Sequence, residues 1–222
     1  MEEERLIVED QVDVHHIKKV LRLRPGERVE LVYDGHLYHG ELLEAGTEAV
    51  FTVLNEVEKQ TPGIAITLIQ GYPKGSKINE ILMHGTECGV DHFVIAQMDR
   101  TIGKVDPKKR DRYQRIIKDA SKQSKRLRIP EVSFEAFSKL DFSRYDRVYF
   151  FYEGSNEPIR TNHSDRSIAI LIGPEGGFSD EEIELVRKLP HITEASLGRT
   201  IYRTETAGLV ACAVLRDRLE AR

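Results

Sequence analysis

The sequence lacks an apolar run long enough to cross a membrane, and it has only two cysteines. No stretch approaches the roughly 20 apolar residues of a membrane-spanning helix. The opening MEEERLIVED has neither the cationic start nor the apolar centre of a signal peptide, so a cytoplasmic protein is expected. Cys88 and Cys212 lie in helical patterns without the spacing of metal ligands. We interpret them as small buried hydrophobic residues and expect no disulfide and no metal site.

An overall positive charge is also lacking, but the charge is unevenly distributed. The formal net charge is −4. Residues 100–128 contain 12 Lys or Arg and three Asp, a local charge of +9, so the rest of the chain carries −13. An exposed helix normally carries charges of both signs at i,i+4 spacing. So few carboxylates among these cations favour binding to a polyanion over a merely solvated helix face.

Two kinds of hydrophobic periodicity divide the chain near Pro62. Before it, apolar residues alternate around Asp34 and Gly35, a dipeptide typical of a tight hairpin turn, and alternate again in EAVFTVLNEVE. This predicts a small β-barrel over residues 1–62. After it, strand and helix patterns alternate, which predicts an α/β domain over residues 63–222 with a largely parallel sheet and helices on both faces. Ligands of such sheets bind beyond the carboxyl ends of the strands.

Three helices are predicted from the spacing of apolar residues or from their caps. In the first domain, DVHHIKKVLRLRPGE places Ile17, Val20 and Leu21 at helical spacing. In the second, DPKKRDRYQRIIKDASKQSKR begins with Asp106 as the N-cap and proline at the first helical position. A further helix in SKINEILMHGTECG has Ser76 as a possible cap. The basic segment is therefore expected to be largely helical.

A glycine-rich loop follows a buried strand in ILIGPEGGFSDEEIELV. It lacks the Lys-Ser/Thr pair of a phosphate-binding loop and the G-x-G-x-x-G pattern of a dinucleotide site. Ser179 and Glu182 are predicted to form a capping box that occupies the first amides of the next helix, so the free backbone of the loop faces elsewhere. A purely structural turn is the alternative, because Pro-x-Gly-Gly is ordinary turn chemistry.

A second loop after a strand, in SLGRTIYRTETAGLVACAV, leads into a helix rich in small residues. Gly208 lies inside that helix, where a glycine costs up to ~1 kcal/mol unless close packing requires it. Close packing is therefore expected, and this helix face is also suited to packing across a two-fold axis. Two glycine-containing strand ends predict a ligand held mainly by main-chain groups, such as an adenosine-type cofactor.

Four segments together resemble one known family over essentially the whole chain. HHIKKVLRLRPGE, PKGSK…TECGVD, LIGPEGGFSDEEI and LGRTIYRTETA are similar, in this order, to the bacterial 16S ribosomal RNA uridine-N3 methyltransferases of the SPOUT superfamily, the RsmE type. The resemblance implies an RNA-binding PUA-like β-barrel in residues 1–62. It implies a SPOUT methyltransferase domain in residues 63–222, whose C-terminal part forms a trefoil knot. The sequence departs from the family pattern at Asn79 and His84, outside the glycine-containing loops.

The resemblance also implies the cofactor, the substrate and a homodimer. S-adenosylmethionine would be the cofactor, and 16S ribosomal RNA the substrate, within the small ribosomal subunit or a late assembly particle. The residues expected around the cofactor are Leu171, Ile172, Gly173, Pro174, Gly176, Gly177, Ser196, Leu197, Gly198, Ile201, Tyr202 and Thr206.

For catalysis, Arg203 is predicted to stabilise charge on the uracil carbonyls or to hold a phosphate. Glu175 and Glu205 are the candidate bases. A structural role is the alternative for both, and for Glu205 it is favoured by the position at a helix start, where a carboxylate is stabilising.

Cationic residues of two segments are predicted to bind RNA, mainly as contacts to the backbone. They are His16, Lys18, Lys19, Arg22, Arg24, Lys122 and Arg126. Pairing with carboxylates within the fold is the alternative for Arg22 and Arg126.

Two other functions are kept as alternatives: a SPOUT ribose 2′-O methyltransferase, and a non-catalytic RNA-binding factor in ribosome assembly.

Overall fold

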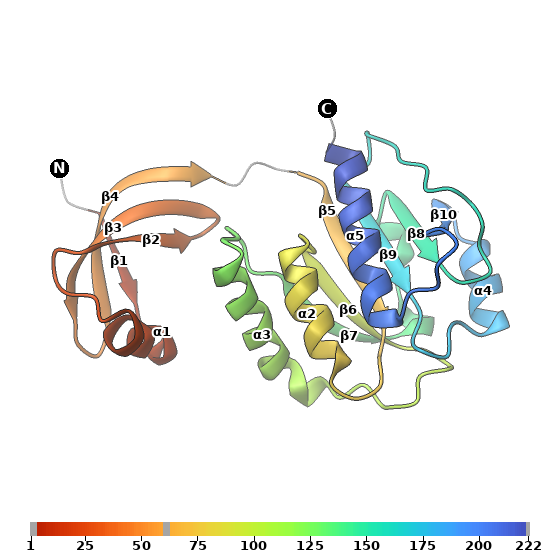
Figure 1. Ribbon diagram of the computed structural model, residues 1–222, viewed down its shortest axis with the longest axis horizontal. Helices are drawn as coiled ribbons and strands as arrows, with labels where there is room; N and C mark the ends of the chain where they lie inside the picture. The colour runs from red at the N-terminus through yellow and green to blue at the C-terminus, as the bar shows by residue number, and fades with distance from the viewer. Residues whose placement is uncertain (1–3, 60–62, 221–222) are drawn as a thin grey trace. The chain divides into compact units, whose positions relative to one another are not determined.

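Two units make up the chain, residues 1–62 and 63–222. The computed structural model describes residues 4–59 and 63–220 (Figure 1). The junction expected at Pro62 therefore lies outside the described residues. None of the helices in these ranges is long and apolar enough to cross a membrane.

A four-stranded antiparallel sheet forms the first unit, with the strand order β1-β4-β3-β2. Asp34 and Gly35 have positive φ angles of 47° and 76° and make the predicted tight turn between β2 and β3. Register shifts along the β3–β4 pair bend the sheet. Within the described residues the ladder ends at β1 and β2, so the expected barrel is a curved, open sheet. The strands are β1 (Arg5–Val8), β2 (Arg28–Tyr33), β3 (His36–Ala45) and β4 (Ala49–Lys59).

The helical segment of the first unit is shorter and less regular than predicted. Helix α1 (Gln11–His15) continues as the π-helix η1 (His16–Leu21). Ile17 is buried in the small core of this unit, as its spacing predicts. Val20 and Leu21 are 62% and 52% exposed, because the wider π turn rotates them away from the sheet.

Six parallel strands form the sheet of the second unit, in the order β10-β8-β9-β5-β6-β7. The alternation of strand and helix patterns predicts a parallel sheet but misses β7, a six-residue edge strand in which polar and apolar residues alternate (EVSFEA). The strands are β5 (Ala65–Gly71), β6 (His92–Gln97), β7 (Glu131–Ala136), β8 (Arg147–Phe151), β9 (Ser167–Ile172) and β10 (Ile192–Ala195).

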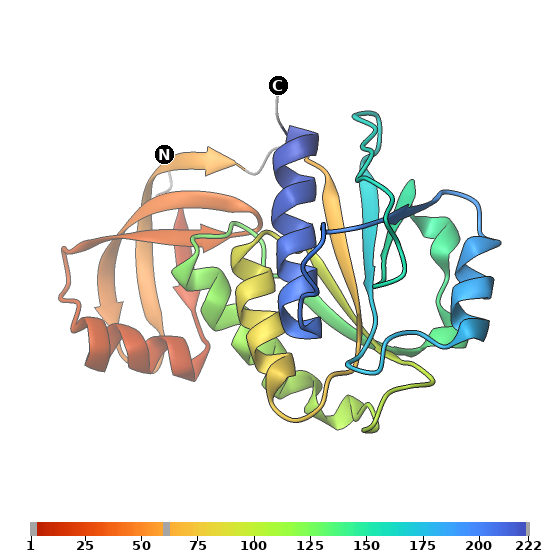
Figure 2. The ribbon, with the colours of Figure 1, turned by 45° about the vertical axis from the view of Figure 1, so that its right-hand side comes forward.

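Helices cover both faces of this sheet (Figures 1 and 2). One face carries α2 (Lys77–Glu87), α3 (Arg110–Gln123) and α5 (Thr204–Glu220). The other face carries α4 (Asp180–Arg187) and the 3₁₀ turns η3 (Phe137–Lys139) and η4 (Phe142–Arg144).

The predicted helix caps are partly right. Before α3 lies the 3₁₀ turn η2 (Pro107–Lys109). Asp106 caps this turn by accepting a hydrogen bond from the backbone N–H of Lys108 at 3.0 Å, as predicted. Ser76 precedes α2 but its side chain makes no capping hydrogen bond, so that expectation was wrong.

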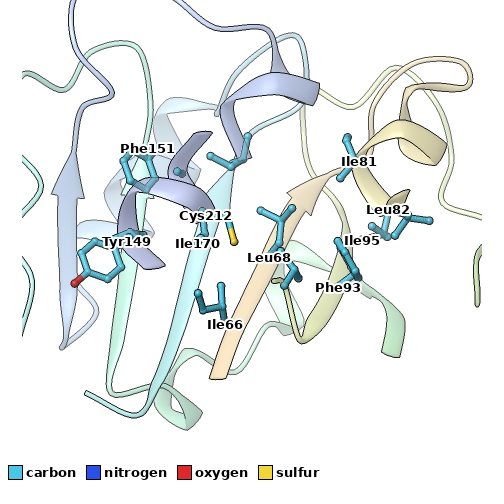
Figure 3. Close-up of a cluster of buried hydrophobic side chains, with 14 of the residues drawn as sticks. Ile66, Leu68, Ile81, Leu82, Phe93, Ile95, Tyr149, Phe151, Ile170 and Cys212 are labelled. Atoms are coloured by element: carbon cyan, nitrogen blue, oxygen red, sulfur yellow. The ribbon is translucent and has the colours of Figure 1, made fainter. Parts of the chain in front are cut away.

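Helix α5 packs closely on the middle of the sheet. Figure 3 shows Cys212 of α5 beside Ile170 of β9 and Leu68 of β5. A Cβ on Gly208 would lie 3.1 Å from Leu68 Cδ1, which is tighter than an ordinary contact. Gly208 therefore serves close packing on β5 of the same chain, as predicted. Packing of this helix face across a two-fold axis stays a prediction.

The C-terminal segment places three strand ends side by side. β10 lies at the outer edge of the sheet beside β8, and the chain then returns as α5 to cover β5 and β9. The trefoil knot that the resemblance implies for this segment stays a prediction.

Candidate functional site

A cavity of about 770 Å³ lies at the carboxyl ends of β8, β9 and β10. Three loops form most of its wall, residues 151–156, 172–178 and 195–204, and Lys77 and Ala207 complete it. Its volume falls within the roughly 300–1,000 Å³ of small-molecule pockets. Its position is the one expected for a ligand of a parallel sheet.

Buried hydrogen bonds hold the loop after β9. The carbonyl oxygen of Gly173 accepts from the Thr204 hydroxyl at 2.6 Å, and Gln70 Nε2 donates to that hydroxyl at 2.8 Å. Further along the loop, Arg100 Nη1 donates to the Gly176 carbonyl at 3.2 Å. Residues of β5, α5 and the segment after β6 therefore fix the backbone of this loop.

The capping box predicted at the start of α4 is confirmed. Glu182 N–H donates to Ser179 Oγ at 3.2 Å, and Ser179 N–H donates to Glu182 Oε2 at 2.9 Å. Ser179 Oγ also donates to Asp99 at 2.7 Å. These groups are satisfied within the protein, so the main-chain groups available to a ligand lie earlier in the loop.

Gly198 defines the conformation of the loop after β10. Its φ angle is +102°, a region that residues with a side chain rarely adopt. Apart from Gly198 and its two chain neighbours, no heavy atom of the described residues lies within 4 Å of the position that a Cβ would take. Backbone conformation rather than a crowded neighbour therefore requires glycine here, and the space beside it belongs to the cavity.

The loop after β8 was missed by the sequence reasoning. It contributes Tyr152 and Glu153 among other residues to the cavity wall. The Tyr152 ring lies 4.8 Å from that of Phe150, and Arg187 donates to both the Tyr152 hydroxyl and Glu194. Burial, followed by the nearby Glu194 carboxylate, raises the pKa of Tyr152. The rule on the carboxyl ends of parallel strands could have found this loop, since it applies to β8 as well.

Of the three predicted catalytic residues, Glu175 and Arg203 line the cavity, whereas Glu205 lies in the first turn of α5 beside it. Lys77 Nζ lies 3.1 Å from Glu175 Oε1 and 3.1 Å from Glu205 Oε2. Both carboxylate oxygens of Glu175 also accept from the Lys74 backbone N–H, at 3.0 and 3.1 Å. Arg203 is exposed on the cavity wall and, among the residues described, forms no ion pair.

These contacts set the protonation of Glu175. Burial acts to raise its pKa, but hydrogen bonds from its own backbone, from Lys77 and from the Lys74 N–H outweigh burial, so the pKa is lowered. The pKa of Lys77 is raised by its hydrogen bonds to Glu175 and Glu205. Both shifts favour the charged forms of Glu175 and Lys77.

Most residues expected around the cofactor line the cavity: Ile172, Gly173, Pro174, Gly176, Gly177, Ser196, Leu197, Gly198, Ile201 and Tyr202. Leu171 does not, because side chains alternate along a strand and its own is buried in the core on the α4 face. Thr206 is exposed in the first turn of α5, and the buried Thr204 lies on the wall instead. The cofactor contacts themselves stay predictions.

The residues expected to bind RNA are exposed, with one exception. Those exposed are His16, Lys18, Lys19, Arg22, Arg24 and Lys122. The exception is Arg126, whose side chain is 14% exposed. It donates to the carbonyls of Thr86 and Val90 and pairs with Asp91, so it joins α3 to the end of α2. For Arg126, the alternative of pairing within the fold is the correct one.

Both units are similar to known RNA methyltransferases. The family described as "RNA methyltransferase domain" matches residues 59–216, and the one described as "RNA methyltransferase PUA domain" matches residues 10–54. Ribosomal RNA small subunit methyltransferase E of Bacillus subtilis is 30% identical to this chain over an alignment of 227 positions. The alignment covers 94% of this chain and 88% of that protein. The protein of the same name from Synechocystis is also 30% identical, and its alignment covers 94% of this chain and 72% of that protein.

Solved structures agree with this similarity. Ribosomal RNA small subunit methyltransferase E from Neisseria gonorrhoeae, bound to S-adenosyl methionine, superposes with a TM-score of 0.84 at 26% identity, covering 97% of this chain and 92% of that chain. A predicted RNA methyltransferase from Thermotoga maritima superposes with a TM-score of 0.76 at 25% identity. The superposition covers 100% of this chain and 97% of that chain.

Proposed function

The chain belongs to the RsmE family of ribosomal RNA small subunit methyltransferases, and we propose that it methylates N3 of a uridine in 16S ribosomal RNA. The observation that carries the proposal is the cavity at the carboxyl ends of β8, β9 and β10. Its wall includes Gly173, Gly176, Gly177 and Gly198, where the main chain can approach a ligand closely. The S-adenosylmethionine bound by the Neisseria relative supports the same cofactor here.

The residues of the cavity fit S-adenosylmethionine, which supplies the methyl group when it is bound. The side chains of Leu197 and Ile201, which are accessible on the cavity wall, offer apolar surface for a purine ring. The loops after β9 and β10 offer main-chain donors and acceptors, which suit an adenosine. The open space beside Gly198 leaves room for ligand atoms against the backbone.

Methylation at N3 requires an in-line approach to the methyl carbon and loss of the imide proton. We assign Arg203 to stabilise the negative charge that develops on the uracil carbonyl oxygens. Glu175 and Glu205 share the ammonium of Lys77, and a carboxylate with a lowered pKa is a weak proton acceptor. We therefore do not assign the role of base to Glu175. Glu205 is not assigned it either, because it pairs with Lys77 and does not line the cavity.

Recognition of RNA is assigned to two basic surfaces, the outward face of α3 and residues 16–24. They would contact backbone phosphates on either side of the target base. N3 lies on the edge used in base pairing, so the uridine must be unpaired or flipped, at a cost of a few kcal/mol. We further propose that the enzyme is a cytoplasmic homodimer and acts on the small ribosomal subunit or a late assembly particle.

Nucleoside mass spectrometry tests the proposed reaction. Isolated 16S RNA and small subunits are incubated with the protein and with S-adenosylmethionine that carries a labelled methyl group. The label is expected on N3 of uridine, and Arg203→Ala should keep RNA affinity but lose turnover. Label on a ribose would identify a 2′-O methyltransferase. RNA binding without transfer would identify a non-catalytic assembly factor.

A further inference from the structure

We propose that Lys77 is a positioning residue that locks the two cofactor loops together through Glu175 and Glu205. The inference rests on the proposed function, because it assigns a role toward the cofactor. It concerns how the cavity is held in shape rather than which atoms the cavity binds. Glu175 and Glu205, taken from sequence alone as candidate bases, become the two attachment points.

The three charged groups come from three separate segments. Lys77 begins α2, Glu175 lies in the loop after β9, and Glu205 lies in the first turn of α5, directly after the loop that follows β10. The ammonium is 3.1 Å from a carboxylate oxygen of each partner. The backbone N–H of Lys74 holds Glu175 from the same side. One cation therefore connects two walls of the cavity to the start of α2.

The cluster is sheltered enough for its charges to matter. The side chains of Lys77, Glu175 and Glu205 are only 30%, 28% and 14% exposed. Pairs at this depth are screened by salt much less than pairs on the open surface. Removing one partner of a sheltered pair leaves the other charge uncompensated, which is more damaging than the loss of a surface pair.

Helix stability does not account for a lysine at this position. Lys77 is the first residue of α2, where the helix dipole disfavours a cation. Ser76 adds no side-chain cap to offset this. The two carboxylates provide the compensation that the helix does not, so the contact to the cofactor loops is the feature that requires a cation here.

Calorimetry of S-adenosylmethionine binding to the full-length protein tests the proposal. Lys77→Met should weaken binding on the order of tenfold or more, because neighbouring charges couple strongly. Lys77→Arg should retain most of the affinity, since a guanidinium can reach both carboxylates. Lys74→Met is the matched control, because Lys74 contributes only its backbone N–H, and it should bind like the wild type. Equal affinity of Lys77→Met and Lys74→Met would overturn the proposal.

A triple variant separates positioning from direct contact with the cofactor. In Lys77→Met the two carboxylates repel each other, whereas Lys77→Met combined with Glu175→Gln and Glu205→Gln removes that repulsion. The triple variant should recover most of the lost affinity. If it binds no better than Lys77→Met, Lys77 does not act through these carboxylates. If thermal denaturation shows that Lys77→Met does not fold, the S-adenosylmethionine affinities of the triple variant and of Lys77→Arg are compared instead. Similar affinities support the proposal, and a much weaker triple variant contradicts it.

A truncated ligand gives a second readout. 5′-Methylthioadenosine lacks the amino-acid part of the cofactor, and Lys77→Met should weaken its binding as well if the loops have moved. Unchanged affinity for this ligand would mean that Lys77 binds the cofactor carboxylate, which contradicts positioning. Failure of the wild type to bind S-adenosylmethionine would instead contradict the proposed function.

Discussion

At the scale of single residues, Gly198 is where backbone conformation and ligand space coincide. Its φ of +102° disfavours any side chain, and a Cβ would project into space that no described residue other than its chain neighbours occupies within 4 Å. Gly198→Val should abolish S-adenosylmethionine binding measured by calorimetry. Gly26→Val is the control, because Gly26 has a φ of +90° and equally open space in the first unit. Wild-type affinity in Gly198→Val, or equal losses in both variants, would contradict the loop assignment.

Glu175 should also make stability depend on pH. Its pKa in the folded chain is below the ordinary value of 4.5, so its contribution to the free energy of unfolding is present above that value and lost as the pH falls through the folded pKa. Glu175→Gln should therefore lower the Tm by a constant amount between pH 8 and 6, and by less below pH 4.5. Thermal denaturation across this range checks the prediction, with the exposed Glu181→Gln as control. A constant difference at every pH would contradict it.

At the scale of elements, α3 separates an apolar face from a cationic one. Tyr113 and Ile117 are buried, whereas Arg112 and Arg115 are exposed and neighbours on the helix surface. The double variant Arg112→Ala with Arg115→Ala should weaken 16S RNA binding. The slope of the logarithm of the RNA-binding constant against the logarithm of the salt concentration should become shallower by about one unit per lost phosphate contact. The affinity for the cofactor should stay unchanged. Filter binding over a salt series provides the measurement.

Arg126 on the same segment serves as the control for this experiment. Because its guanidinium binds two carbonyls and Asp91, Arg126→Ala should lower the Tm and leave the salt dependence unchanged. If the Arg112 and Arg115 variant behaved in the same way, α3 would be a structural helix and the proposed RNA surface would be wrong.

Elements whose partners are close in sequence were predictable. The capping box of Ser179 and Glu182, the Asp106 cap and the turn at Asp34 and Gly35 each depend on residues within a few positions of one another. β7 was not predicted although its residues alternate between polar and apolar, because six residues with a single fully buried side chain give only a weak strand signal. The ion pairs of Lys77 with Glu175 and Glu205 could not be predicted, because these residues are far apart in the sequence and only the fold brings them together.

At the scale of the whole molecule, the sheet order determines where the site lies. The alternation of elements predicts a parallel sheet, but not that β8, β9 and β10 are neighbours. That adjacency joins three loops into one cavity and adds the loop after β8, which has no recognisable motif of its own. Gly208 of α5 shows a related limit: the sequence indicates close packing there, while the fold shows that β5 is its neighbour.

The proposed homodimer needs an exposed apolar surface, and Ile201 offers one. This apolar residue is 84% exposed at the cavity wall, and we propose that a partner subunit packs against it. Sedimentation at micromolar concentration should give roughly twice the monomer mass of 25.4 kDa. Ile201→Asp should shift the protein toward monomer, since a charge there would be buried on association. Ile102→Asp, at a residue 74% exposed in another loop, should remain dimeric. A wild-type enzyme that is active as a monomer would contradict the dimer, and dissociation of both variants alike would remove Ile201 from the interface.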